Sequence, residues 1–286
     1  MNIIKNKNIF LTLSGILLVA SVAALLTFGL KEGIDFIGGT QWEISGVKNE
    51  TLQLVLPKEA NVATGGQDSF IIRLPELSEI DHQKYFKQIK EKDIEAMELS
   101  FESIGSSIGY ELKKKAIWAF LLVLLGISLY IAIAFRKVSR PVSSWKYGVI
   151  TLLTLFHDAL IPTGLMAVLG WLYGAEIGVN FIVAVLVVMG FSVHDTIVVF
   201  DRIRENLRLE KNTNFDFAEL VNKSIVQTFA RSVNTSLTLI LVLIALYFMG
   251  ATSLNYFTLI ILVGVIVGTY SSIFVASPLL VLVNRK

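Results

Sequence analysis

Six stretches of about twenty or more predominantly apolar residues occupy most of this chain, and they restrict its fold more than any other feature. They cover about residues 9–30, 116–135, 147–171, 179–200, 226–250 and 255–283. A helix rises about 1.5 Å per residue, so about 20 apolar residues cross the roughly 30 Å of hydrocarbon in a bilayer. With 54% hydrophobic and only 17% charged residues, the composition predicts an integral membrane protein with six transmembrane helices.

The first apolar stretch follows Lys5 and Lys7, which is also the charge pattern of a secretory signal peptide. It continues to Leu30, however, and is therefore longer than the roughly 7–15 apolar residues of a signal-peptide core. We interpret residues 1–30 as a short N-terminal end followed by an uncleaved membrane helix. The chain contains no cysteine, which excludes disulfide bonds and thiolate metal sites.

Lysine and arginine gather in the connections on one side of the predicted helices, and this bias indicates the cytoplasmic side. It places both termini and the loops 136–146 and 201–225, within the helical region 116–286, in the cytoplasm. The basic residues are Lys5, Lys7, Arg136, Lys137, Arg140, Lys146, Arg202, Arg204, Arg208, Lys211, Lys223, Arg285 and Lys286. The opposite short connections, 171–179 and 250–254, contain one acid and no base.

Residues 31–115 then form one extracytoplasmic domain, in which we count 11 Lys and Arg against 15 Asp and Glu. The residue pattern predicts strands at 39–45, 69–74 and 95–103 and helices at 49–56 and 78–90. Pro57 ends the first of these helices, and Ser78 is suited to cap the second. We expect a small α+β sandwich after the first membrane helix.

Asp195 lies inside the apolar stretch 179–200. An ionisable group at membrane depth costs on the order of 3 kcal/mol, so it usually pairs, lines a wet path or carries protons. The helix rise places Asp195, Arg231 and Asp158 about 22, 28 and 20 Å from the outer surface. We therefore expect these three charged groups, from three spans, to share one layer. Gly190, one turn before Asp195, allows a close approach of a neighbouring helix.

A polar stripe accompanies Arg231 on its helix. Asn234, Thr235 and Thr238 follow it at spacings that place them on the same face, which must contact protein or water. Two interpretations of the charged layer remain open. It is either an ion pathway, or a static buried salt bridge between Asp195 and Arg231 that fixes helix register.

Two histidines adjoin the carboxylates, and we expect both to be packing or interfacial residues. His194 points about 100° away from Asp195 on a helix, and we apply the same interpretation to His157 beside Asp158. The sequence has no phosphate-binding loop, metal-ligand helix motif or nucleophile elbow. We expect no enzymatic activity, no cofactor, no metal site and no nucleic-acid partner.

Several segments resemble the SecF family, the smaller half of the SecDF protein-export accessory. Residues 190–206, GFSVHDTIVVFDRIREN, resemble its fourth-span signature. Four further segments agree in order along the chain: 33–40 (GIDFIGGT), 103–109 (SIGSSIG), 156–158 (FHD) and 231–236 (RSVNTS). The resemblance covers essentially the whole chain, although His194 and Phe191 replace the asparagine and tyrosine that are common in the family.

The resemblance implies half of an RND-type unit in the bacterial inner membrane. It implies a SecD partner, work beside the SecYEG channel with YajC on a translocating preprotein, and contact with membrane lipid. Asp195 and Arg231 match the family's proton-pathway carboxylate and arginine, whereas Asp158 matches in sequence only. The coupling ion, proton or sodium, stays open.

Two competing functions share the charged membrane layer. One is an RND-type exporter of small molecules or lipids, against which the outer domain of about 80 residues argues, because a substrate pocket would need more protein. The other is a scaffold that stabilises the translocase without conducting ions. In that case, charge-neutral replacement of Asp195 would leave function intact.

Overall fold

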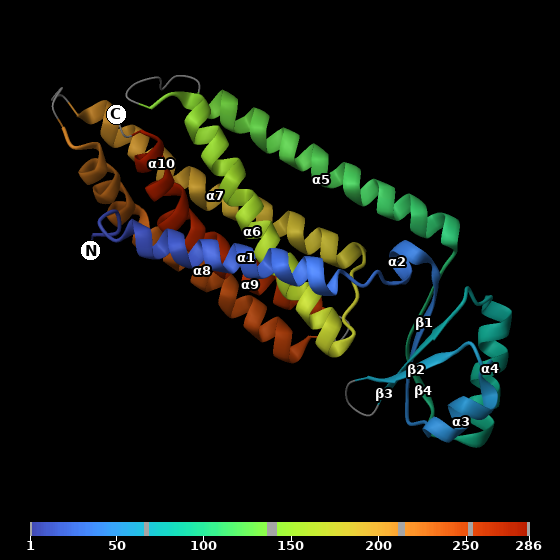
Figure 1. Cartoon of the computed structure of the whole chain (residues 1–286). Helices are drawn as coiled ribbons and strands as arrows, with labels where there is room; N and C mark the ends of the chain where they lie inside the picture. Colours follow the sequence, from blue (N-terminus) through green and yellow to red (C-terminus); the bar gives the residue numbers. More distant parts are fainter. Residues whose placement is uncertain (1, 66–68, 136–141, 211–214, 251–253, 285–286) are drawn as a thin grey trace. The chain divides into compact units, whose positions relative to one another are not determined.

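The computed structural model describes residues 2–65, 69–135, 142–210, 215–250 and 254–284. Within these residues, six helical segments are long and apolar enough to cross a membrane, which confirms the predicted fold class (Figure 1). They are α1 (Lys7–Phe28), α5 (Ser106–Phe135), α6 (Ser144–Tyr173), α7 (Val179–Leu209), α8 (Phe217–Met249) and a last span, Asn255–Val283. The last span consists of α9 (Asn255–Ser271), the π-helical turn η2 (Ser272–Ala276) and α10 (Ser277–Val283).

Some helices continue beyond their apolar stretches. Because α7 ends at Leu209 and α8 begins at Phe217, much of the expected loop 201–225 is helical. Side chains three or four positions apart stabilise such polar helix ends, as Arg202 and Glu205 do at 2.6 Å. Six basic residues used in the topology argument lie outside the described residues: Arg136, Lys137, Arg140, Lys211, Arg285 and Lys286.

The chain forms two compact units. One contains Glu32–Trp118, which includes the first part of α5, together with Ile177–Val179, and the rest of the membrane helices belongs to the other. The bounds of this first unit are close to those of the expected outer domain, 31–115, and the unit also includes the connection that precedes α7. All of the described β-strands lie in this unit, which we call the outer unit after that expectation.

A four-stranded antiparallel sheet, in the order β2-β3-β1-β4, forms the centre of the outer unit. The strands are β1 (Gly39–Ser45), β2 (Asn61–Thr64), β3 (Ser69–Leu74) and β4 (Met97–Ile104). Alternate residues of β1 are buried because successive side chains point to opposite faces of a sheet. Trp42 of β1 is fully buried and pairs with Ile72 of β3 and Phe101 of β4, so it lies at the centre of the core.

Two helices complete this core, α3 (Asn49–Val55) and α4 (Glu79–Lys92). They contribute Leu52 and Ile89, both fully buried. The hydroxyl of Ser78 accepts the backbone N–H of Asp81 at 3.2 Å, which confirms the predicted N-cap of α4.

The predicted strands and helices of the outer unit are confirmed with shifts of a few residues, but two elements were not predicted. These are the short helix α2 (Ile34–Ile37) and the edge strand β2. Each has four residues, which is too few for a repeating pattern of apolar side chains to appear in the sequence.

The segment that follows α1 is fixed by a glycine and by an acidic side chain. Gly38 has φ +79°, and a Cβ there would lie 2.7 Å from the Cα of Ser106, so only glycine fits without displacing the backbone. Asp35 Oδ2 accepts the backbone N–H of Val179 at 2.7 Å. A carboxylate at this position satisfies one of the free donors in the first turn of α7 and complements the helix dipole.

In the membrane unit, α6, α7 and the last span are the most buried helices, whereas α1, α5 and α8 expose most of their residues. α6 packs against α1 and α9, and α9 packs against α8 (Figure 1). At Gly164 of α6, a Cβ would lie 2.5 Å from the Cβ of Ser21 on α1. Small residues allow this close approach, as is usual between membrane helices.

Candidate functional site

Two glycines bring α9 against α7 and thereby position the site. A Cβ on Gly264 would lie 2.1 Å from Val188 Cγ2, and a Cβ on Gly268 would lie 3.1 Å from the Cβ of Ser192. The four-residue spacing of these glycines is the small-xxx-small pattern that lets helix backbones approach in membranes. The next turn of the last span is therefore held beside the polar residues of α6 and α7.

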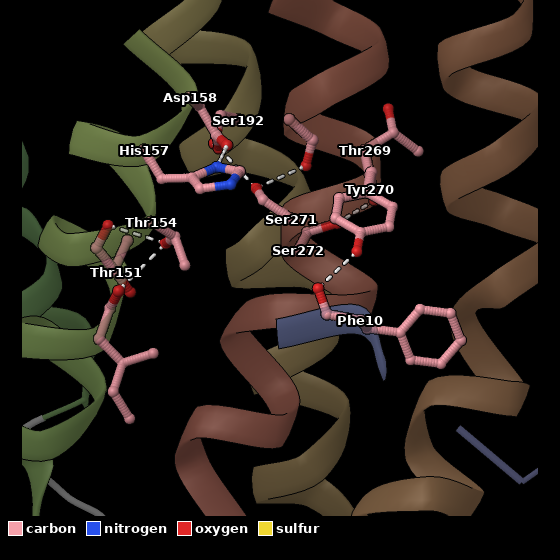
Figure 2. Close-up of polar contacts among 12 residues, drawn as sticks. Phe10, Thr151, Thr154, His157, Asp158, Ser192, Thr269, Tyr270, Ser271 and Ser272 are labelled. Atoms are coloured by element: carbon pink, nitrogen blue, oxygen red, sulfur yellow. Dashed lines mark hydrogen bonds and ion pairs between the residues drawn. The ribbon is translucent and has the colours of Figure 1, made fainter. Parts of the chain in front are cut away.

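Asp158 of α6 is fully buried and has three polar partners (Figure 2). His157 Nδ1 lies 2.7 Å from Asp158 Oδ1. The hydroxyls of Ser271, at 2.5 Å, and of Ser192 both donate to Asp158 Oδ2. Three helices thus converge on this carboxylate, since Ser192 belongs to α7 and Ser271 ends α9.

Asp195 of α7 is 4% exposed, and the hydroxyl of Ser272 donates to its Oδ2. Ser272 directly follows Ser271, so one turn of the last span contacts both buried carboxylates. Asp158 and Asp195 thus lie in one polar region, because consecutive serines contact them.

The backbone changes its hydrogen-bond pattern at this turn. The π-helical turn η2 begins at Ser272, and Pro278 occupies the start of α10. Proline has no N–H to donate to the preceding turn. The hydroxyl of Ser277 donates to the carbonyl of Ser272 at 3.3 Å, which satisfies one acceptor within η2. Single π-helical turns of this kind often occur at functional sites.

Arg231 does not reach the carboxylates in the chain by itself. It is exposed, and within the described part of the chain its side chain forms no ion pair or hydrogen bond. The static salt bridge with Asp195 is therefore not formed here. Depth along the helices placed these groups in one layer, but depth alone does not determine which side of α8 faces the other helices.

The polar stripe beside Arg231 is exposed as well. Asn234, Thr235 and Thr238 lie on the outward face of α8, and the two threonine hydroxyls donate to carbonyls of their own helix. The inward face of α8 has a different polar set: Ser224, Thr228, Ser232 and Ser236. Of these, Ser236 lies 2.5 Å from Thr269 on α9.

Within the described part of the chain no helix approaches closely at Gly190, so the close approach that this glycine allows stays a prediction. Gly190 is exposed, and a Cβ there would meet no atom within 4 Å. The close approach of α7 occurs instead at Val188 and Ser192, opposite the glycines of α9. His194 is exposed, whereas His157 is buried and contacts its neighbouring carboxylate.

Sequence reasoning missed the serines that contact the carboxylates. Signals for them exist: Ser192 lies one turn before Asp195, and Ser271 and Ser272 form an adjacent polar pair in an apolar span. A serine in an apolar helix is ordinary by itself, because its hydroxyl can donate to a carbonyl one turn earlier. Only the three-dimensional contacts distinguish these serines from the others.

The chemistry of the site follows from what surrounds its two carboxylates. Their contacts are neutral hydroxyls and one imidazole, and no lysine or arginine pairs with them among the described residues. A buried carboxylate that stays ionised without a paired cation is costly. A serine hydroxyl can donate to an ionised carboxylate and accept from a protonated one. The arrangement therefore suits the uptake and release of a proton or a small cation.

Comparisons with known proteins agree with this organisation. The family model for protein export membrane protein SecD/SecF, C-terminal, matches residues 82–286, and that for the SecD/SecF GG motif matches residues 23–45. Protein translocase subunit SecF of Thermobaculum terrenum is 43% identical, with 100% of this chain and 94% of the relative covered. SecF of Rhodothermus marinus is 37% identical, with 94% and 88% covered.

A solved structure gives the same result for the fold. The crystal structure of SecDF, a translocon-associated membrane protein from Thermus thermophilus, matches with a TM-score of 0.84 and 36% identity. The match covers 100% of this chain and 39% of the SecDF chain. The chain therefore has the length of the SecF relatives but spans less than half of the longer SecDF protein.

Proposed function

This chain belongs to the SecF family of protein translocase subunits, and we propose that it couples an ion gradient to preprotein translocation together with a SecD partner. As a member of this family with six apolar helices, it is a multi-pass inner-membrane protein with a role in protein export. The proposed step is the completion of translocation through SecYEG, driven by protons or sodium ions. The buried carboxylates, Asp158 and Asp195, are the observation that carries this proposal.

The outward position of Arg231 supports a partner at the face of α8. Ionisable residues within membrane spans normally face a protein interior or a water-filled cavity rather than lipid. Arg231 and its polar stripe are exposed in the chain by itself, so we propose that the SecD partner covers them. The Thermus SecDF relative supports this idea, because this chain covers only 39% of that chain and leaves room for a second half.

The proposed cycle uses Asp195 as the ion-binding group. Asp195 takes up a proton or cation from one side, and a rearrangement with the partner brings Arg231 near and favours release to the other side. One elementary charge moving through 100 mV supplies about 2.3 kcal/mol. That is enough to change the ratio of two domain positions by roughly fiftyfold, since about 1.4 kcal/mol corresponds to a factor of ten. The chain thus acts as a transport subunit rather than an enzyme.

We propose that both termini lie in the cytoplasm and that the outer unit lies on the opposite side. Lys5, Lys7 and the basic end of α7, with Arg202, Arg204 and Arg208, support this orientation. The outer unit would then meet the preprotein as it leaves the channel. YajC and membrane lipid complete the proposed surroundings.

Preprotein translocation into energised inverted membrane vesicles tests the proposal. Vesicles containing SecD and either this chain or its Asp195→Asn variant are compared with and without an ion gradient. Asp195→Asn should lose the gradient-dependent fraction and keep the fraction driven by ATP. Asp201→Asn is the matched control, because it removes the same charge from an exposed position on the same helix. Unchanged translocation by Asp195→Asn would instead favour the scaffold function.

A further inference from the structure

We propose that Ser271 and Ser272 are positioning residues that couple the protonation of Asp158 to that of Asp195 through one turn of the last span. This inference rests on the proposed function, because it assumes that the carboxylates exchange protons during the cycle. It assigns Ser271 and Ser272 to the pathway, a role that neither the sequence pattern nor the family match gives them. The geometry of each hydroxyl carries the argument.

Each serine hydroxyl has two acceptors within reach. Ser271 Oγ lies 2.5 Å from Asp158 Oδ2 and 3.1 Å from the carbonyl of Gly268. Ser272 Oγ contacts Asp195 Oδ2 and lies 3.0 Å from the carbonyl of Thr269. A hydroxyl has a single hydrogen, so it donates fully to only one of these acceptors at a time.

The charge of the carboxylate decides which acceptor is used. An ionised carboxylate has no hydrogen and accepts the one from serine. A protonated carboxylic acid donates its own O–H to the serine oxygen, and the serine hydrogen then turns to the backbone carbonyl. Both states keep every hydrogen bond of the serine satisfied, and no covalent bond other than the carboxyl O–H forms or breaks.

The backbone next to these serines is suited to respond. A serine that donates to a carbonyl one turn earlier tends to bend its helix. Ser272 is also the first residue of η2, where the hydrogen-bond pattern departs from that of an α-helix, and Pro278 follows shortly after. Turning either hydroxyl therefore acts on an already irregular part of the last span. A change at one carboxylate reaches the other through the peptide bond that joins the two serines.

The two serines are not equivalent. Asp158 keeps the hydroxyl of Ser192 and the imidazole of His157 when Ser271 is removed. Asp195 has no other hydrogen-bond partner than Ser272 in the described part of the chain. Removal of Ser272 should therefore have the larger effect. The ionisable side chains on the surrounding helices include His157, Asp158, His194, Asp195, Arg231 and Tyr270.

Infrared difference spectroscopy on the full chain with its SecD partner, recorded between acidic and alkaline pH, tests the proposal. The carboxyl band of Asp195 is the band that Asp195→Asn removes. In Ser272→Ala this band should move to higher wavenumber, because the carboxyl group loses its hydrogen-bond partner. Ser272→Thr, which retains the hydroxyl, should restore the wild-type position of the band.

Coupling has its own readout in the same experiment. The band that Asp158→Asn removes should change in Ser272→Ala, although Ser272 does not contact Asp158. Ser236→Ala is the matched control, since Ser236 is a buried serine whose hydroxyl contacts Thr269 instead of a carboxylate. Assembly with SecD shows that each variant is folded.

An Asp195 band that is the same in Ser272→Ala and wild type would overturn the proposal, as would the absence of any band that Asp195→Asn removes. An Asp158 band that is the same in Ser272→Ala and wild type would contradict the coupling between the two carboxylates. The proposed function fails separately, when Asp195→Asn leaves gradient-dependent translocation unchanged while the infrared bands still respond to Ser272.

Discussion

Individual acidic residues of this chain differ in what surrounds them. Asp158 and Asp195 are buried in membrane helices and contact serine hydroxyls. Asp93, in the outer unit, is instead partly exposed to water and accepts the backbone N–H of Lys48 at 3.1 Å. That hydrogen bond is the main reason why the pKa of Asp93 lies below its ordinary value. An acid of this second kind stabilises the fold, whereas the buried pair is suited to ion transfer.

Asp93 gives the outer unit a pH dependence of known sign. Its pKa is lower in the folded state, so its contribution to stability is present above its unfolded pKa and is lost as the pH falls through the folded value. Asp93→Ala should therefore unfold at a lower temperature than wild type at neutral pH. The difference should vanish at strongly acidic pH. Thermal unfolding followed by limited proteolysis of the outer unit measures it, and a difference that is independent of pH would contradict this origin.

The sequence predicted which types of residue form the site, but not which of them contact one another. A carboxylate in an apolar stretch is visible in any sequence, and both Asp158 and Asp195 are buried. The orientation of Arg231 was not predictable, because a polar stripe of an amphipathic helix shows that it needs a polar environment but not which protein provides it. The serine contacts depend on the packing of the last span.

At the scale of elements, the contact between α7 and α9 determines where the serine pair lies. Gly264 and Gly268 allow this contact, and their spacing is recognisable in the sequence as a small-xxx-small pattern. Gly190 is equally easy to recognise in the sequence, but a Cβ there would meet no atom of the described chain within 4 Å. A lone glycine therefore allows a close approach without showing that a helix of the same chain makes it, whereas the repeated glycines of α9 do contact α7.

Alanine substitutions at two glycines test this contact. Gly264→Ala would place a Cβ 2.1 Å from Val188 Cγ2 and 2.9 Å from its Cβ, so α7 and α9 must separate. Overpacking of this kind costs about 1–3 kcal/mol. Gly190→Ala, with open space around it, should be neutral or slightly stabilising because alanine favours a helix. Thermal unfolding in detergent compares the variants, and equal stability of both would argue against a tight contact between α7 and α9.

At the scale of the whole molecule, the exposed face of α8 is polar but is not covered by other helices of the described chain. It carries Arg231, Asn234, Thr235 and Thr238, although it belongs to a membrane span. The six spans and the main strands of the outer unit were predictable because long apolar runs and alternating residues are local signals. Contacts with a partner are not local, so the sequence identified the polar face without its occupant.

Cysteine cross-linking tests whether SecD covers this face. The chain has no cysteine of its own, so each introduced thiol is unique. Asn234→Cys and Thr238→Cys should cross-link to cysteines placed along the membrane helices of SecD. Ser236→Cys is the control on the same helix, because Ser236 is buried within the chain and should not react. Equal cross-linking at the buried and exposed positions would contradict the proposed interface.

Ion flux tests the central claim most directly. The purified chain with SecD is reconstituted into vesicles, a proton or a sodium gradient is imposed, and uptake is followed with an internal pH dye or with isotopic sodium. Wild type should transport one of these ions, which also identifies the coupling ion. Asp195→Asn should fall to the level of empty vesicles, while Asp201→Asn keeps the wild-type rate. Undiminished flux through Asp195→Asn would contradict the assignment of Asp195 as the ion-binding group.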